Sequence, residues 1–206
     1  HGNLPRGDRD AGIGVDAGQG PTVTMTRVSI QDNHMGGVRA MEPGTSVTMT
    51  DCVVIDTMSR ARDLGHGLAF NVQTGASLTV ERTLAMSHRE HSLIFLQGAT
   101  GQLTDLAVLD TLGRERDDMF GRGINIQSES VVYGTRVLIA RAHEVGLFIS
   151  NATGEWEDIV IVDTLPQTDD GDAGRAIQVS EASDVSMLRL LMERNHEIAI
   201  LVADEG

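Results

Sequence analysis

The segments Gly123-Ile-Asn-Ile126 and Gly146-Leu-Phe-Ile149 begin alike and lie 23 residues apart, and the same kind of start recurs along the chain. A small residue precedes each short apolar run, and eight such starts align, at spacings of 25, 30, 25, 31, 23, 30 and 23 residues. Repeats of this length, here alternately short and long, are typical of solenoids, in which each repeat stacks on the next. The other starts are Gly12-Ile-Gly-Val15, Gly37-Val-Arg-Ala40, Gly67-Leu-Ala-Phe70, Ser92-Leu-Ile-Phe95, Ala176-Ile-Gln-Val179 and Ala199-Ile-Leu-Val202.

Each repeat also contains two further short runs with period-two alternation, such as Thr22-Val-Thr-Met-Thr26 and Val28-Ser-Ile30. Half-buried strands show this alternation, whereas an amphipathic helix needs apolar residues at i, i+3 and i+4. Three short strands in rungs of 23–25 residues, alternating with rungs of 30–31, predict an all-β parallel β-helix of about seven to eight rungs. The helix-like stretch from Met187 to Glu197 aligns with these rungs, so we expect it to form a strand and turn.

The composition limits the classes of partner. The 206 residues include 16 Lys or Arg and 30 Asp or Glu, and the net charge of −14 disfavours nucleic acid. No apolar run approaches the roughly 18 residues of a membrane span. The single cysteine, Cys52, excludes an internal disulfide, and no targeting signal is visible. We expect residues 1–206 to form one β-helix domain, a segment of a longer solenoid that lacks caps.

Aligned repeats place apolar residues in columns that we expect to stack in the interior, about 4.8 Å apart. Cys52 falls in such a column beside Val28 and Leu106, which predicts a buried, inert thiol. The clearest column contains Met25, Met49, Val80, Leu103, Trp156 and Met187.

One outward column alternates in charge at every repeat. Because equal positions in a parallel stack lie roughly 5 Å apart, alternation gives each charge an opposite neighbour, and a slip by one rung would bring like charges together. We interpret the column as a control of register. Its members are Arg27, Asp51, Arg82, Asp105, Arg136, Asp158 and Arg189.

A second outward column lies at the corners that close the short rungs. His34, His143 and His196 align there with Arg89, and each His or Arg except His34 is followed by Glu. Equivalent corners lie about 9.6 Å apart, too far to share one metal ion, so we predict that these residues cap turns. The densest set, should one corner be active, is His88, Glu90 and His91.

Three long insertions, at 56–66, 110–122 and 163–175, each open with Asp-Thr and are rich in polar residues. We expect all three on the same side, and loops on a rigid scaffold commonly carry binding residues. We also expect them to fold back over the outward apolar residues Ile94 and Phe148. The candidate ligand-binding residues are Arg60, Arg62, Asp63, Arg114, Arg116, Asp117 and Asp118.

No cofactor other than calcium is indicated. The candidate calcium ligands are Asp169, Asp170 and Asp172, since calcium prefers carboxylate oxygens. The segment lacks the further spaced ligands and terminal Glu of a calcium-binding loop.

With these features the chain resembles the right-handed parallel β-helix superfamily, the pectin-lyase-like solenoids. It is most similar to repeat proteins of that type on or outside the cells of myxobacteria and related deltaproteobacteria. The residues that carry the resemblance are Gly75-Ala-Ser-Leu-Thr-Val-Glu-Arg82, Gly121-Arg-Gly-Ile-Asn-Ile-Gln127 and Glu193-Arg-Asn-His-Glu-Ile198. The resemblance covers essentially the whole chain and implies a right-handed helix.

The resemblance implies a fold and not an activity. Hydrolases of the superfamily carry an Asn-Thr-Asp motif, an Asp-Asp pair and an Arg-Ile-Lys motif, a set that this chain does not assemble. We therefore expect a non-catalytic extracellular or cell-surface scaffold whose loops bind a protein or polysaccharide, with end-to-end self-association as a further expectation.

The alternative is a carbohydrate-active enzyme, either a lyase or an inverting glycoside hydrolase that acts on an acidic polysaccharide. Two carboxylates about 9.6 Å apart lie near the upper end of the separation in inverting glycosidases. The candidate catalytic residues of this alternative are Asp110, Asp163, Arg122, His88 and Glu90.

Overall fold

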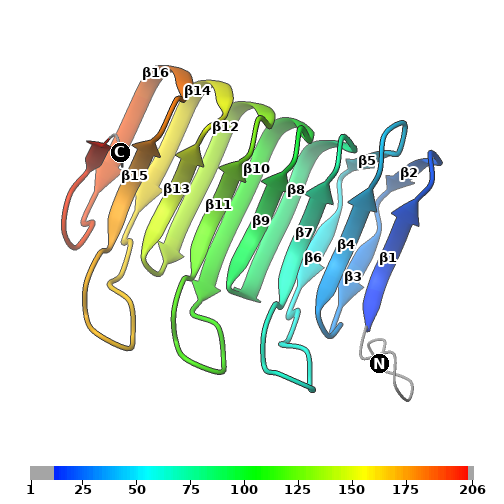
Figure 1. Ribbon diagram of the computed structural model, residues 1–206, viewed down its shortest axis with the longest axis horizontal. Coiled ribbons are helices and arrows are strands. Elements are labelled where there is room, and N and C mark those ends of the chain that lie inside the picture. The colour runs from blue at the N-terminus through cyan, green and yellow to red at the C-terminus, as the bar shows by residue number, and fades with distance from the viewer. Residues whose placement is uncertain (1–11, 204–206) are drawn as a thin grey trace.

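The computed structural model describes residues 12–203, and all regular structure in that range is β-strand. The strands form two long parallel sheets, and the chain alternates between them (Figure 1). In sheet order, the first sheet contains β1 (Ile13–Gly18), β4 (Gly36–Met41), β7 (Leu68–Gln73), β9 (His91–Leu96), β11 (Arg122–Gln127), β13 (Val145–Ser150), β15 (Arg175–Ser180) and β17 (Ile200–Ala203).

The second sheet has nine strands, and we call a strand of the first sheet plus the following segment of the second sheet a coil. In chain order, the second sheet contains β2 (Thr22–Thr26), β3 (Ser29–Gln31), β5 (Ser46–Thr50), β6 (Val53–Ile55), β8 (Ser77–Arg89), β10 (Thr100–Leu112), β12 (Val131–Ala142), β14 (Thr153–Val162) and β16 (Asp184–Glu193). The predicted all-β class and parallel pairing are confirmed, and the stretch near Met187 is strand, as expected. Within residues 12–203, no helix is long and apolar enough to cross a membrane.

Successive coils pair in the register that the repeats predict. Met25 lies opposite Met49, and Leu103 lies opposite Val80. Cys52 is buried in the core, as expected. The prediction of three separate strands per rung holds only for the first two coils, because from β8 onward the second and third strands are one continuous strand.

The second sheet bends at a residue in the left-handed region without losing its hydrogen bonds to the next coil. The seven members of the charge-alternating column occupy this position, with φ between 48° and 58°. At these bends Arg27 donates its N–H to Thr50 O and Asp51 donates to Glu81 O, at 2.9 and 3.0 Å. An L-residue with positive φ is strained, so the stacking of coils must hold these bends in place.

The charged side chains at these bends form ion pairs between adjacent coils. Each of three Arg residues donates from Nε to the Asp of the preceding coil. These hydrogen bonds hold the pKa of Asp51, Asp105 and Asp158 below the usual value. We call this column the first charge ladder; its pairs are Arg82–Asp51, Arg136–Asp105 and Arg189–Asp158, with Nε–Oδ1 distances of 2.6, 2.6 and 2.5 Å.

The core fits its largest side chain through glycine. The buried indole of Trp156 lies opposite Gly134, and a Cβ atom at Gly134 would overlap the ring. A Cβ at Gly154 would lie only 2.6 Å from Trp156 Nε1. Glycine at these two positions therefore makes room for the only tryptophan.

Gly134→Ala is expected to lower the free energy of unfolding by about 1–3 kcal/mol, because overpacking forces neighbouring side chains out of position. The measurement is urea unfolding at neutral pH. Gly18→Ala is the matched control, since its added Cβ would meet only Met41 O at 3.8 Å. Equal unfolding midpoints for the two variants would contradict the packing described for Trp156.

Candidate functional site

Three loops project from the same edge of the stack (Figure 1). Loop 1 joins β6 to β7, loop 2 joins β10 to β11, and loop 3 joins β14 to β15. The boundaries differ from those predicted at 110–122 and 163–175, because Asp110 to Leu112 belong to β10, and Arg122 and Arg175 begin β11 and β15. The loops follow every second coil, so their bases lie about 9.6 Å apart.

All three loops share one backbone structure. The first residue of a six-residue turn donates its N–H to the carbonyl of the sixth and accepts a hydrogen bond from the N–H of the fifth. The N–H donations are Arg60 to Gly65, Arg114 to Met119 and Gln167 to Asp172, each at 2.8 Å. The returning donations are Leu64 to Arg60, Asp118 to Arg114 and Gly171 to Gln167, at 2.8, 2.7 and 3.0 Å.

Four of the predicted ligand-binding residues fix the shape of the loops that contain them. Arg60 forms a two-point hydrogen bond with Asp63, and Arg114 forms the same pairing with Asp117. The Arg114 guanidinium lowers the pKa of Asp117 to about 2, and Arg60 lowers the pKa of Asp63. Loop 3 has Gln167 in place of the arginine.

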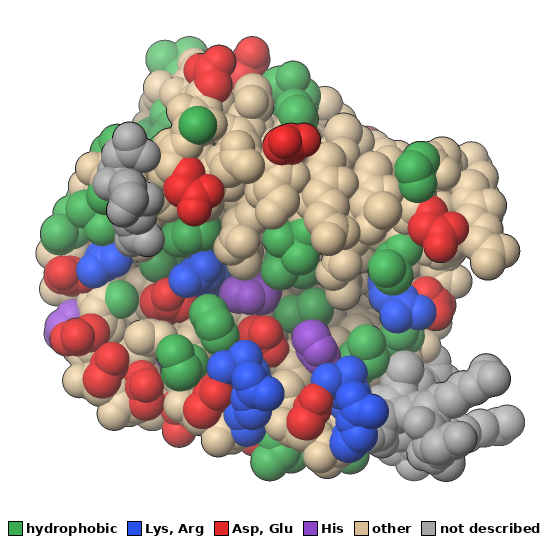
Figure 2. All heavy atoms as spheres, viewed as in Figure 1, with side chains coloured by type: hydrophobic (Ala, Val, Ile, Leu, Met, Phe, Trp, Pro, Cys, Tyr) green, Lys and Arg blue, Asp and Glu red, His purple; other side chains and the backbone are tan. Residues whose placement is uncertain are grey.

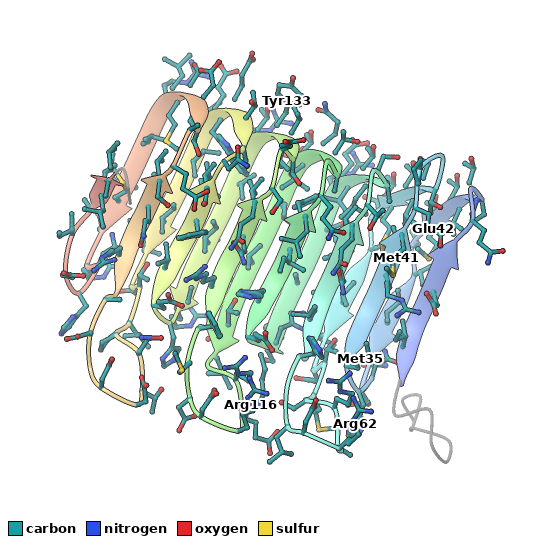
Figure 3. The ribbon with its side chains drawn as sticks, in the orientation of Figure 1. Met35, Met41, Glu42, Arg62, Arg116 and Tyr133 are labelled. Carbon is teal, nitrogen blue, oxygen red and sulfur yellow. The ribbon has the colours of Figure 1, made fainter. Side chains whose placement is uncertain are left out.

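The other three predicted ligand-binding residues, Arg62, Arg116 and Asp118, are exposed. Figure 3 shows Arg62 and Arg116 on neighbouring loops at this edge, whereas Tyr133 lies at the opposite edge. Figure 2 shows Arg, Asp and Glu side chains gathered along the same edge. These three charged side chains are therefore accessible to solvent, and Arg116 Nε also donates to Asp117 Oδ2 at 3.2 Å.

A row of exposed apolar side chains lies at the loop bases. Met58, Leu112 and Leu165 occupy equivalent positions with exposed fractions of 45%, 38% and 41%, and Leu64 and Met119 in the loops are exposed to a similar degree. Sequence reasoning missed this row, although each of the three follows the Asp-Thr pair that opens its insertion. We call the three loops and this row the loop edge.

Residues of the short corners hold the loops in place. His34 Nδ1 lies 3.1 Å from Ser59 O, and His143 Nδ1 lies 3.1 Å from Pro166 O. Arg89 takes the same role in the coil between, donating to Gly113 O at 3.3 Å. The predicted turn-capping role is confirmed, and the capped carbonyls are those at which the loops leave the stack.

Glu90 lies between loops 1 and 2 and contacts a residue of each. Its Oε2 accepts the N–H of His66 at 2.6 Å and lies 3.9 Å from His66 Nδ1, and its Oε1 lies 3.8 Å from Arg114 Nη1. The side chains of Glu90 and Arg114 are only 12% and 13% exposed. Burial lowers the pKa of His66, and the charge of Glu90 opposes that effect.

Two aromatic rings pack beside Arg114, the loop 2 partner of Glu90. His91 is buried on β9 with its ring 5.5 Å from that of Phe120, and Arg114 and Arg122 lie over the Phe120 ring at 4.7 and 5.3 Å. Burial and the nearby guanidinium groups lower the pKa of His91 well below its usual value. His91 is therefore neutral and packs against the Phe120 ring.

Arg122, a candidate catalytic residue, has partners on both sides. It forms a two-point ion pair with Glu144, at 2.7 and 3.1 Å, and stacks 3.9 Å above the ring of Phe148. Phe148 and Ile94 are only 8% and 9% exposed, and Phe148 is covered by the Arg122 guanidinium of β11, whereas cover by the long loops stays a prediction.

The structure separates the other candidate catalytic residues. Asp110 and Asp163 are bonded through Oδ1 to Arg141 and Arg194 at 2.5 and 2.6 Å, which lowers the pKa of both carboxyl groups. These four form a second charge ladder that sequence reasoning missed. An ion-paired carboxylate with a lowered pKa is a poor general acid.

His88 lies inside the stack and not at the surface corner where sequence reasoning placed it. Its ring is fully buried, Nε2 lies 3.0 Å from Val54 O, and Nδ1 has no hydrogen-bond partner among the described residues. Burial lowers the pKa of His88 to about 4. The candidate group of His88, Glu90 and His91 is therefore not one solvent-accessible set.

The candidate calcium ligands lie in loop 3. Asp170 Oδ1 accepts the N–H of Asp172 at 2.9 Å, an interaction that closes the turn. Across residues 12–203, no three His, Cys, Asp or Glu side chains are grouped closely enough to hold a metal ion. The geometry thus adds no support to the calcium hypothesis.

The last coil exposes apolar residues of its own. Leu191, Ile200 and Val202 on β16 and β17 have exposed fractions of 48%, 42% and 74%. End-to-end self-association stays a prediction that this exposure permits.

His88→Thr places at this buried position the residue found at Thr111 in the adjacent strand. Between pH 6.5 and about 4 the unfolded chain binds a proton at His88 that the folded protein does not, so stability falls as the pH falls through this range. This difference corresponds to on the order of 3 kcal/mol. His88→Thr is expected to be less stable at pH 7 but to lose less stability between pH 6.5 and 4, as measured by urea unfolding.

His196→Thr, at an exposed corner, is the control for this prediction. An unchanged pH dependence in His88→Thr would mean that His88 is not buried as a neutral ring.

No protein-family model matches the chain, and neither a curated protein nor a solved structure matches it.

Proposed function

We propose that the protein is a non-catalytic scaffold that binds a protein or polysaccharide partner through its three loops. The observation that carries this proposal is the identical hydrogen-bonded turn in all three loops, each anchored by a corner residue of the preceding coil. A repeated, rigid loop presents side chains at a fixed spacing with little loss of entropy on binding.

We also propose a specific form for the stacked coils. A right-handed parallel β-helix of seven to eight rungs, of the pectin-lyase-like type, accounts for the parallel register and for alternating short and long coils. The right hand is favoured because crossovers between parallel strands of one sheet are almost always right-handed. Location outside the cell or on its surface rests on the resemblance to bacterial surface repeat proteins.

The arrangement of carboxylates supports binding over catalysis. Asp110 and Asp163 are held in ion pairs with arginine, and Asp63 and Asp117 are held in the same way inside the loops. Each carboxylate has an arginine partner that keeps it ionised, so it serves structure better than proton transfer.

A second candidate function, a polysaccharide lyase or hydrolase, is favoured by one observation only. Glu90 is a half-enclosed carboxylate next to the His66 ring and the Arg114 guanidinium. Among the candidate catalytic residues, Glu90 is the carboxylate that remains close to another group able to transfer a proton.

The two functions are distinguished by incubation with a panel of acidic and neutral polysaccharides, with and without calcium. Unsaturated products, reducing ends and thermal shift are measured together. We expect no turnover, and any thermal shift should be lost in a variant with Arg62→Ser, Arg116→Ser and Asp118→Ser. Glu155→Gln, on the outer face of the second sheet, is the control.

Turnover that disappears in Glu90→Gln would overturn the scaffold proposal and place the chemistry at Glu90. Turnover lost in Asp110→Asn or Asp163→Asn would place it at the second charge ladder instead.

A further inference from the structure

The outer face of the second sheet carries a regular set of hydroxyl groups on the neighbouring strands β2, β5, β8 and β10. Alternate residues of these strands belong to the core, so the residues between them face outward. Each strand has three outward positions before its bend, and all except Glu81 and Gln102 carry a hydroxyl group. We call the outward Ser and Thr residues of segments 22–26, 46–50, 77–81 and 100–104 the hydroxyl array.

The hydroxyl groups lie in columns because the strands pair without an offset. Thr24 lies opposite Thr48, which in turn lies opposite Thr79. Equivalent residues are about 4.8 Å apart along a column, and alternate residues of one parallel strand are about 6.6 Å apart. The array therefore repeats in two directions on a hydrogen-bonded sheet.

The preference of Thr for strands does not account for the array, because that preference applies to the whole sheet. On β12, β14 and β16, the same three outward positions carry only one Ser or Thr per strand, at Thr135, Thr153 and Ser186. The other outward positions there include Tyr133 and Glu155, both of which are exposed. The array is thus confined to one part of a face whose backbone geometry is the same throughout.

The hydroxyl groups of the array are available to a partner. Within residues 12–203, only Ser77 Oγ among them has a hydrogen-bond partner in the protein, Thr45 O at 3.3 Å. The β-branched side chain of Thr is stiff about χ1, so each Thr holds its hydroxyl and methyl groups in place. A partner would therefore bind the array with little loss of side-chain entropy.

The array is poor in charge and in aromatic rings. Among the outward positions of its four segments, the only ionisable residue is Glu81, which forms an ion pair with Arg82. None of these positions carries an aromatic side chain on which a sugar ring could stack. The surface that fits the array is therefore uncharged, with hydrogen-bonding groups that repeat in two directions.

We propose that the hydroxyl array binds the surface of ice. Water molecules in an ice crystal are uncharged, are fixed in position, and repeat in two directions at spacings close to those of the array. A hydroxyl group both donates and accepts hydrogen bonds, as a water molecule does, so it can take the place of a water molecule at the crystal surface. This activity goes beyond the proposed binding through the loops and uses a different face of the protein.

Slow growth of ice into a dilute solution of the protein tests the proposal. The protein concentrations in the ice and in the remaining liquid are measured, and the shape of ice crystals grown in the solution is recorded. The wild-type chain is expected to enter the ice and to give faceted crystals. Thr48→Tyr is expected to lower the ice-to-liquid ratio roughly tenfold, because the raised ring separates several neighbouring hydroxyl groups from the crystal and each lost hydrogen bond weakens binding.

Thr153→Tyr is the matched control, because it makes the same substitution at an exposed outward position of β14, outside the array. It should enter ice as the wild type does, as should the variant with Arg62→Ser, Arg116→Ser and Asp118→Ser. Tyrosine suits a strand, and the thermal unfolding midpoint of each variant separates weakened ice binding from misfolding.

The inference would be overturned by a wild-type chain that stays in the liquid, by a Thr48→Tyr variant that enters ice unchanged, or by equal losses in the two tyrosine variants. Retention on crystalline cellulose instead of ice, lost in Thr48→Tyr, would assign the array to a polysaccharide and overturn the inference as well. None of these outcomes bears on the loops, whereas turnover in the polysaccharide panel would overturn the proposed function and leave ice binding in place.

Discussion

In-register parallel stacking is the constraint on which the rest of this structure depends. Each coil lies directly on the preceding one, so a strand residue has the equivalent residue of the next coil as its neighbour, about 4.8 Å away. This geometry stabilises columns of apolar residues in the interior, and a column of like charges on the outside would destabilise the stack. The first charge ladder avoids repulsion between like charges because Arg and Asp alternate from coil to coil. The second ladder avoids it in the same way, with Asp110, Arg141, Asp163 and Arg194.

The ladders also act where the backbone is strained. Their members adopt positive φ at the bends of the second sheet, a conformation that β-strands avoid. A two-point Arg–Asp pair between coils holds both bends at once, so the electrostatic pair and the backbone bend stabilise the same register. Loss of these pairs at low pH follows from the lowered pKa of the aspartates: the stabilisation is complete above their usual value and disappears as they become protonated.

Stacking also explains which features could be read from the sequence. The interior columns, the alternation of the first ladder and the capping corners follow from aligned repeats alone, because equivalent residues must be neighbours. The orientation of residues after a bend could not be read in this way. A left-handed residue breaks the period of two, so His88 points inward although its place in the repeat suggested an outward corner.

The partners of Asp110 and Asp163 were missed because the second ladder becomes regular only in the later coils. The exposure of Met58, Leu112 and Leu165 depends on how far the loops fold back, and that distance is set by tertiary contacts.

The most direct test of this account is disulfide formation between cysteines introduced in adjacent strands of the second sheet. Thr79 and Gln102 face each other in register on β8 and β10, whereas Thr104 lies two residues further along β10. Replacing Thr79 and Gln102 by cysteine should give rapid, nearly complete oxidation, because a disulfide requires Cα atoms no more than about 7 Å apart. The pair at Thr79 and Thr104, roughly 8 Å apart on the diagonal, should remain reduced under the same conditions. Preferential oxidation of the diagonal pair would contradict the register and, with it, the stacked arrangement of ladders and loops.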